Sequence, residues 1–214
     1  MDKEINLMIN LLEKPKEITL AGLKTWTGHI GQHQVTISKC GIGKVNSALN
    51  TYRLIQLIKP DMVINSGVAG GAGIPIGTLL IADKVAYHDV WCGPGTLYGQ
   101  ADDMPLFMDP CLKITDNIDE SQYVKGLICS GDKFISSAEE ILFIKSKFPE
   151  VKAVDMESAS IAQTCLICEI PFAIIRVVSD TPGEGENISQ YRDFWIKAPE
   201  KTFDIIKKIL ESLK

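Results

Sequence analysis

The sequence has no excess of positive charge and no long apolar run. Its 214 residues carry a formal net charge of −5, which argues against a surface for nucleic acid or for anionic membranes. No apolar run approaches the roughly 20 residues of a membrane-spanning helix. The first residues carry acidic side chains and lack a small-residue cleavage site, so no signal peptide is predicted.

Several common site motifs are also missing. No cluster of Cys and His has the spacing of zinc ligands, and no G-x-S-x-G elbow is present. The turn at 39–44 lacks the spacing of a Walker loop, although its two glycines allow N–H groups to face an anion. No G-x-G-x-x-G with a following helix appears after the strand expected at 62–65, which disfavours a dinucleotide-binding fingerprint.

The cysteines are best explained as reduced, mostly buried thiols, and we expect a cytoplasmic protein. Cys165 and Cys168 form a C-x-x-C, but a redox motif needs its first cysteine at an exposed helix N-terminus. Here the pair falls late in a predicted helix among apolar residues, so a structural role is predicted. The other cysteines are Cys40, Cys92, Cys111 and Cys129.

The order of the predicted elements indicates one α/β domain over residues 1–214. Apolar spacing predicts the helices, and β-branched runs bounded by glycine predict the strands. Ser137 and Glu140 form a capping box at the start of one helix. The expected helices cover 2–12, 45–58, 137–147 and 187–214, and the expected strands cover 17–20, 23–28, 34–38, 62–65, 77–87 and 123–129.

Two carboxylates follow predicted strands in the stretch 152–182. Glu157 lies just past a short apolar strand, and Asp180 ends a β-branched run that begins at Phe172. One small-residue helix separates the two strands, and this βαβ pattern favours a parallel sheet. In such sheets ligands bind outside the carboxyl ends of the strands. We therefore expect Glu157 and Asp180 to face one crevice.

Other residues fit either a site or a structural role. The glycines within 66–73 mark close approach of the backbone to a ligand or to another segment. Phe134 fits core packing or ligand contact, and Glu4 fits a favourable charge in the first turn of a helix. His88 fits a hydrogen-bonded structural histidine better than a catalytic base. The long loop at 90–110 is expected to be functional or interfacial.

Carboxylates, a serine and an arginine make up the candidate site, and they are Glu4, Glu157, Asp180, Ser179 and Arg176. This set suits protonation of a leaving group and activation of water. A carboxylate also offers two acceptor oxygens to the vicinal hydroxyls of a sugar. The residues alone therefore indicate a hydrolase or transferase that acts on a polar small molecule.

Six motifs in order along the chain resemble those of the bacterial methylthioadenosine/S-adenosylhomocysteine nucleosidases. They are Cys-Gly-Ile-Gly-Lys-Val (40–45), Ser-Gly-Val-Ala-Gly-Gly (66–71), Tyr-His-Asp (87–89), Ser-Gly-Asp-Lys-Phe-Ile (130–135), Val-Asp-Met-Glu-Ser-Ala (154–159) and Arg-Val-Val-Ser-Asp (176–180). The resemblance covers nearly the whole chain. It implies the nucleoside phosphorylase-like α/β fold, in which a mixed central sheet, partly barrel-like, is flanked by helices.

The same resemblance implies an activity and its requirements. The family hydrolyses the N-glycosidic bond of 5′-thio-adenosines to give adenine and the free thioribose, in methionine salvage. The resemblance implies no metal, no organic cofactor, a nucleoside as the small-molecule partner, and a homodimer.

A catalytic role follows from the resemblance for each of four residues. Asp180 matches the general acid that protonates the imidazole ring of adenine, and Ser179 matches the residue that orients it. Glu4 matches the base that activates the attacking water, with Arg176 nearby to position that water. The raised pKa that Asp180 needs as an acid is expected from burial.

The substrate pocket is assigned in the same way. Glu157 matches the carboxylate that holds the ribose hydroxyls, and Met156 matches the residue beside the sugar. Phe134 matches the ring stacked on adenine, and the backbone of Ile135 matches the group that contacts the edge of the base. The other matched positions are Ala69 and Gly70 near the ligand and Ile42 in the pocket for the 5′-thio group.

Three features depart from the family pattern. The family usually begins with a short apolar strand before the motif that contains Glu4. That strand is expected to be missing before Met1, at a cost in stability and in the placement of Glu4. Val68 stands where the family often has a serine or threonine. Tyr191 stands about where an aromatic pocket residue is expected, one residue out of register.

Two other functions use the same residues. A phosphorylase of this fold would need an arginine-rich anion site, whereas the sequence holds only three arginines, and Glu4 would repel phosphate. A catalytically silent nucleoside-binding protein would keep Phe134 and Glu157 but lose the function of Glu4. Dependence on phosphate separates hydrolase from phosphorylase, and product formation separates both from a binding protein.

Overall fold

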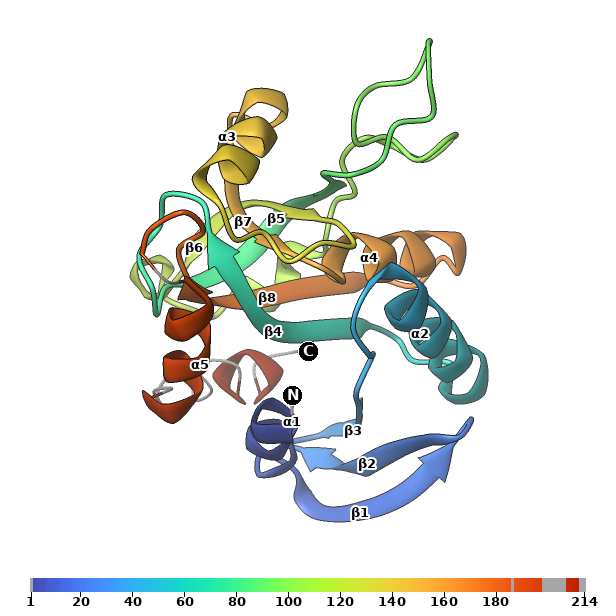
Figure 1. Cartoon of the computed structure of the whole chain (residues 1–214). Coiled ribbons are helices and arrows are strands. Elements are labelled where there is room, and N and C mark those ends of the chain that lie inside the picture. The colour runs from blue at the N-terminus through green and yellow to red at the C-terminus, as the bar shows by residue number, and fades with distance from the viewer. Residues whose placement is uncertain (1, 186, 198–206, 212–214) are drawn as a thin grey trace.

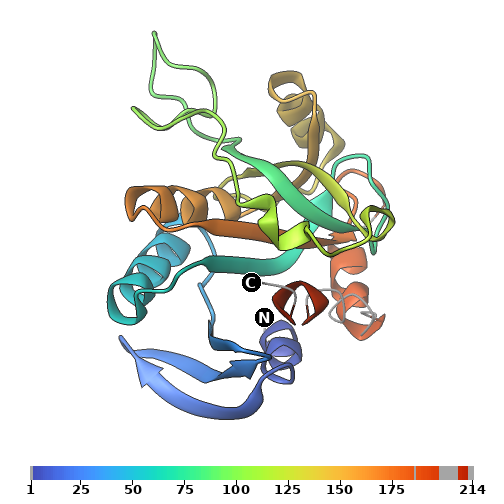
Figure 2. The ribbon, with the colours of Figure 1, turned by 180° about the vertical axis from the view of Figure 1, so that it is seen from behind.

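A closed barrel and a separate three-stranded sheet lie opposite each other in this protein (Figures 1 and 2). The computed structural model describes residues 2–185, 187–197 and 207–211, and the side chains of all of these except 2–4 and 195–197. The described helices are α1 (Asp2–Ile9), α2 (Lys44–Ile58), α3 (Ala138–Lys147), α4 (Ser158–Ile167) and α5 (Asn187–Lys197). The described strands are β1 (Glu13–Leu20), β2 (Leu23–Ile30), β3 (His33–Ser38), β4 (Val63–Gly71), β5 (Leu79–Tyr87), β6 (Val124–Ser130), β7 (Val151–Asp155) and β8 (Phe172–Asp180).

The small sheet is the antiparallel meander that the sequence predicts. β2 pairs with β1 on one side and with β3 on the other. Gly22 and Gly31 form the two tight turns with φ values of 78° and 58°, which glycine adopts without a steric penalty. These turns fix the register of the strands, since Leu20 lies opposite Leu23 and Ile30 lies opposite His33.

The barrel has the strand order β4-β7-β6-β5-β8. β5, β6 and β7 run parallel to one another, and β4 and β8 run parallel to each other. The two groups meet through antiparallel pairs, β4 with β7 and β5 with β8. The sheet is therefore mixed, as the family resemblance implied.

The parallel arrangement that the βαβ pattern favoured for the two strands flanking α4 is wrong. β4 lies between them, parallel to β8 and antiparallel to β7. The carboxyl ends of β7 and β8 nevertheless meet, because β4 pairs with both at its own end. Gly70 lies opposite Asp180 on one side and opposite Val154 on the other. Glu157 and Asp180 therefore approach the carboxyl end of β4 from its two sides.

β4 continues past its predicted end at Asn65 and includes the glycine-rich run. A Cβ atom on Gly71 would lie 2.7 Å from the carbonyl oxygen of Ile74 and 2.8 Å from Cγ1 of Val178. The glycines therefore admit a close approach of neighbouring chain segments, which is one of the two interpretations that the sequence left open.

Most other elements agree with the prediction within a few residues. The capping box of α3 has both of its bonds, since the Ser137 hydroxyl accepts from the Glu140 N–H and the Glu140 carboxylate accepts from the Ser137 N–H. The first helix ends at Ile9 instead of Leu12. In the predicted terminal helix, α5 and residues 207–211 are helical, and 198–206 and 212–214 lie outside the described residues.

Buried apolar residues fill the barrel and the space between it and the helices. Every residue of β8 is buried, as expected for a strand that is covered on both faces. α4 packs on α2, and the hydroxyl oxygens of Ser47 and Ser160 lie 2.6 Å apart between them. The N-terminal ends of both helices are thereby held beside each other. Among the described helices, none is long and apolar enough to cross a membrane.

Candidate active site

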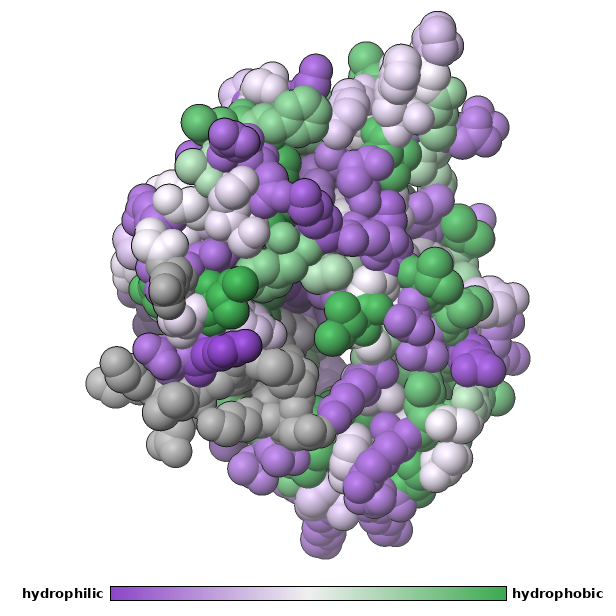
Figure 3. Space-filling model, viewed as in Figure 1, coloured by the Kyte–Doolittle hydropathy of each residue, from purple (hydrophilic) through white to green (hydrophobic). Residues whose placement is uncertain are grey.

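A cavity of about 1300 Å³ separates the barrel from α1 and the small sheet. The surface is hollowed at this place in Figure 3, below the barrel. Every predicted site residue whose side chain is described lines this cavity. They are Ile42, Val68, Ala69, Gly70, Phe134, Ile135, Met156, Glu157, Arg176, Ser179, Asp180 and Tyr191.

Asp180 ends β8 and holds a buried carboxylate that is 2% exposed. The hydroxyl of Ser179 donates to its Oδ1 at 2.7 Å, and the amide of Asn187 donates to its Oδ2 at 3.1 Å. Burial raises the pKa of the Asp180 carboxyl, and the two hydrogen bonds offset part of that rise because they stabilise the charged form. The raised pKa is what a general acid near neutral pH requires.

Asn187, which is not among the residues predicted from the sequence, contacts the candidate acid Asp180. It begins α5, is 3% exposed, and also donates to the carbonyl oxygen of Ile135 at 3.2 Å. One amide thus connects the carboxylate of Asp180 to the segment after β6. The only sequence signal was an asparagine at the start of a helical pattern, which is more often a helix cap.

Glu157 follows β7 at the start of α4, and its side chain lines the cavity. Its Oε1 accepts a hydrogen bond of 3.0 Å from the backbone N–H of Gly43. Burial and then the nearby charge of Asp155 raise the pKa of Glu157, whereas the Gly43 N–H and the Arg176 guanidinium lower it.

The glycine turn before α2 faces carboxylates of the protein itself. Gly43 donates to Glu157, and the N–H of Lys44 donates to Oδ1 of Asp132 at 2.7 Å. The turn was predicted to be able to face an anion, and in this structure side-chain carboxylates take that place.

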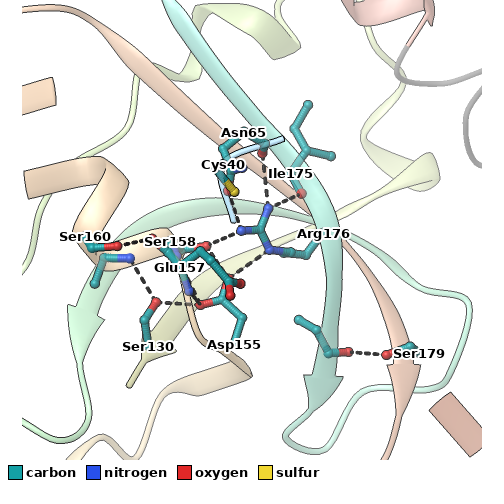
Figure 4. A network of polar contacts seen from close by, with 12 residues as sticks. Cys40, Asn65, Ser130, Asp155, Glu157, Ser158, Ser160, Ile175, Arg176 and Ser179 are labelled. Atoms are coloured by element: carbon teal, nitrogen blue, oxygen red, sulfur yellow. Dashed lines mark hydrogen bonds and ion pairs between the residues drawn. The ribbon is translucent and has the colours of Figure 1, made fainter. Parts of the chain in front are cut away.

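Arg176 is buried beside the cavity in a dense polar network (Figure 4). Its Nε donates to Asp155 at 2.8 Å. Its two terminal nitrogens donate to Asn65 on β4, to Ser158 on α4 and to the carbonyl oxygen of Ile175. All three nitrogens are therefore engaged with the protein, and positioning of a water by Arg176 stays a prediction.

Phe134 and Tyr191 form an aromatic corner of the cavity. Their ring centroids are 5.8 Å apart at an interplanar angle of 73°, an edge-to-face contact. Phe134 is 40% exposed, which leaves ring surface for a planar ligand. Tyr191 lies one turn after Asn187 on α5, so the helix brings both side chains to the same side.

The end of β4 lines the cavity mainly with backbone atoms, because its residues there are small. A Cβ atom on Gly70 would lie 2.9 Å from Cγ of Pro182 and 3.4 Å from Oδ2 of Asp180. Glycine at this position therefore allows the strand to lie against the carboxylate. Val68 and Ala69 precede it along the cavity wall, and Ile42 is 71% exposed at the cavity.

Two other candidates have a different outcome. The side chain of Glu4 lies outside the described residues, so its assignment as the base stays a prediction, although its neighbour Ile5 lines the cavity. His88 is buried and is not among the residues that line the cavity. Burial lowers the pKa of His88, and its buried Nε2 has no hydrogen-bond partner among the described residues, so the predicted hydrogen-bonded structural role is not confirmed.

The C-x-x-C has the structural character that the sequence predicts. Cys165 is buried within α4, and burial raises the pKa of its thiol to about 12. A thiol of this kind is a poor nucleophile, because the thiolate is the reactive form. The described structure contains free thiols at all six cysteine positions of the sequence.

Comparison with known proteins places this geometry in a family. The family model of the phosphorylase superfamily matches residues 1–211. The chain is 36% identical over 227 residues to a 5′-methylthioadenosine/S-adenosylhomocysteine nucleosidase of Bacillus thuringiensis (strain Al Hakam), covering 100% of this chain and 96% of that protein.

Solved structures give the same result. A 5′-methylthioadenosine/S-adenosylhomocysteine nucleosidase from S. pneumoniae, with the transition-state inhibitor MT-ImmA, superimposes with a TM-score of 0.91 at 34% identity and covers 100% of this chain and 96% of that chain. One from Colwellia psychrerythraea, in complex with adenine, has a TM-score of 0.90 at 31% identity and covers 98% of this chain and 91% of that chain. The chain belongs to the phosphorylase superfamily, and its similarity within it is to the methylthioadenosine/S-adenosylhomocysteine nucleosidases.

The hydrogen bond from Asn187 to Asp180 generates a prediction about acidity. Replacing Asn187 with Leu keeps the branched shape of the side chain and removes the donor that stabilises the charged carboxylate, so the pKa of Asp180 should rise further. Titration of the Asp180 carboxyl carbon by NMR measures this shift. Asn50→Leu is the matched control, because its amide donates to the Cys40 carbonyl and not to Asp180. An unchanged or lower pKa in Asn187→Leu would contradict the assignment.

Proposed function

We propose that this protein hydrolyses the N-glycosidic bond of 5′-methylthioadenosine and S-adenosylhomocysteine and releases adenine and the thioribose. The observation that carries the proposal is the buried carboxyl group of Asp180, held by two hydrogen bonds at the wall of the cavity. The full-length similarity to nucleosidases of that specificity supports the choice of substrate.

Asp180 is the general acid of the reaction. Its carboxyl group donates a proton to the imidazole ring of adenine, which makes the base a better leaving group while positive charge develops on the ribose. A positioned general acid contributes about 10²–10⁴ in rate. Burial supports this role, because it keeps the proton on the carboxyl group to a higher pH than in water. Activity is then lost as the pH rises through the pKa of Asp180.

The remaining roles are distributed around the same cavity. Glu157 holds the ribose hydroxyls, and one of its oxygens is already fixed by the N–H of Gly43. The exposed ring of Phe134 stacks on adenine. Glu4 activates the attacking water, and the position of α1 against the cavity is compatible with this role.

Water is favoured over phosphate as the nucleophile by the surroundings of the α2 N-terminus. That turn, the natural anion site, already faces Glu157 and Asp132. Of the three arginines in the chain, all described by the structure, Arg176 alone lines the cavity, and its nitrogens are engaged by the protein. A phosphate dianion would meet carboxylates here without an arginine free to bind it.

A homodimer is part of the proposal. One face of α2 carries exposed apolar side chains at helical spacing, namely Val45, Leu49 and Tyr52, with Ile42 just before the helix. Such a face is typical of a subunit contact. We place the enzyme in the cytoplasm, where the free thiols would stay reduced, and in methionine salvage.

The activity is tested by adenine release from 5′-methylthioadenosine with and without phosphate. The proposed hydrolysis gives adenine and methylthioribose at the same rate in both conditions. Release that requires phosphate, with formation of a sugar phosphate, would identify a phosphorylase. Binding of the nucleoside without any release would identify a binding protein.

Asp180→Asn removes the proton that the leaving base needs. We expect kcat to fall by roughly 10²–10⁴, with the dissociation constant of adenine within a few-fold of the wild-type value. Asp193→Asn is the control, since this aspartate lies exposed on α5. Wild-type turnover in Asp180→Asn would sink the general-acid assignment.

Sedimentation tests the homodimer. We expect a dimer at micromolar concentration, and Leu49→Glu should shift it toward monomer because a charge would be buried in the contact. Lys125→Glu is the control charge change, because Lys125 is exposed on β6 and not on α2, and this variant should leave the dimer intact. A monomeric wild-type protein at that concentration would contradict the proposal.

A further inference from the structure

Glu157 occupies the N-cap position of α4 but does not cap the helix. The first N–H groups of a helix lack partners within it, and the side chain of the N-cap residue usually accepts from one of them. The Glu157 side chain makes no such bond. Its carboxylate extends instead toward Gly43, on another element, and lines the cavity.

Asp155 takes over the capping of α4 from two residues earlier. Its Oδ1 accepts from the N–H groups of Glu157 at 3.3 Å and Ser158 at 3.2 Å. The hydroxyl of Ser130 donates to the same oxygen at 2.5 Å and accepts from the N–H of Ala159 at 2.9 Å. Three successive N–H groups are therefore bound, directly or through Ser130, and the Glu157 side chain is released for another use.

Arg176 makes this arrangement possible by compensating the buried charge of Asp155. The two side chains are 2% and 3% exposed, and an unpaired carboxylate at that depth would be strongly destabilising. The Arg176 guanidinium is itself fixed, because it also donates to Asn65 on β4 and to the hydroxyl of Ser158 (Figure 4). The cap is thus anchored to the barrel and cannot rotate independently of it.

We infer that Asp155 is a positioning residue for the reaction: it fixes the first turn of α4 through Ser130 and Arg176, so that the Glu157 carboxylate points into the cavity. The inference rests on the proposed function, in which Glu157 holds the ribose hydroxyls. Under this inference Arg176 is the counter-ion of the Asp155 carboxylate that caps α4.

The charge of Asp155 gives the inference a second consequence. It acts on Glu157 in the direction that raises the pKa of that carboxyl group, after the larger effect of burial. Replacing Asp155 by Asn removes this contribution and leaves the opposing one from Arg176. The pKa of Glu157 should then fall, and ionised Glu157 should persist to lower pH.

Two variants and one control test the positioning role. Ser130→Ala removes the hydroxyl between Asp155 and Ala159, and Asp155→Asn removes the charge. Thr164→Ala is the control, because it too removes a buried hydroxyl. That hydroxyl lies within α4 and donates to the Ser160 carbonyl. Contacts to the sugar are made in the ground state and in the transition state alike, so their loss raises KM and largely spares kcat.

We expect KM for 5′-methylthioadenosine to rise about tenfold in Ser130→Ala, with kcat within about threefold and Thr164→Ala near wild type. A purely structural role would lower the amount of active enzyme, and hence the apparent kcat, at constant KM. In Asp155→Asn the contribution of Glu157 ionisation to the acid limb of kcat/KM should move to lower pH, while the alkaline limb set by Asp180 stays in place. An unchanged KM in Ser130→Ala together with an unchanged acid limb in Asp155→Asn would overturn the inference.

A measurement independent of turnover separates this inference from the proposed function. NMR titration of the Glu157 carboxyl carbon should give a lower pKa in Asp155→Asn than in wild type. If the wild-type protein releases no adenine, the proposed function fails, and the titration still decides the link between Asp155 and Glu157. An unchanged Glu157 pKa in Asp155→Asn would overturn that link.

Discussion

The buried ion pair between Asp155 and Arg176 is the constraint on which the active site depends. Asp155 ends β7 and Arg176 lies on β8. Through its hydrogen bonds the pair joins these two strands to β4 at Asn65, to the end of β6 at Ser130 and to the first turn of α4. A buried pair of this kind adds little net stability over an apolar contact, but removing one partner leaves an uncompensated charge and costs about 3–5 kcal/mol. The pair therefore specifies geometry: it fixes how the barrel strands and α4 meet at the cavity.

That geometry gives two carboxylates different tasks. Asp180 is enclosed by β4 and α5 and receives side-chain donors from Ser179 and Asn187, while burial favours its protonated form. The carboxylate of Glu157 accepts from the backbone N–H of Gly43 and lines the cavity, and its pKa is raised by the charge of Asp155 and lowered by that of Arg176. One carboxyl group is suited to give up a proton and the other to accept hydrogen bonds from hydroxyls. The strands that precede them, β7 and β8, both pair with β4 at Gly70.

The sequence predicted the local elements and the pairing of Glu157 with Asp180 at one cavity. Periodicity, glycine turns and the Ser137 capping box depend on residues that are close along the chain, and these predictions agree with the structure. The parallel arrangement of β7 and β8 was wrong, because which strand lies between two others is decided by long-range pairing. The same limit applies to the site, because Asn187 and Asp155 act through partners that are far away in the sequence. The residues next to Asn187 in the sequence do not distinguish it from an ordinary helix cap, and those next to Asp155 do not reveal its partners.

In the proposed function, one cavity holds a nucleoside between the sugar-binding carboxylate and the general acid. The most direct measurement is a crystal structure with an uncleavable analogue of 5′-methylthioadenosine, in which a C–H replaces the imidazole-ring nitrogen that accepts the proton. We expect the ribose hydroxyls on the carboxylate of Glu157, the purine against Phe134, and its five-membered ring beside Asp180. A nucleoside bound elsewhere, or a sugar held without Glu157, would contradict it.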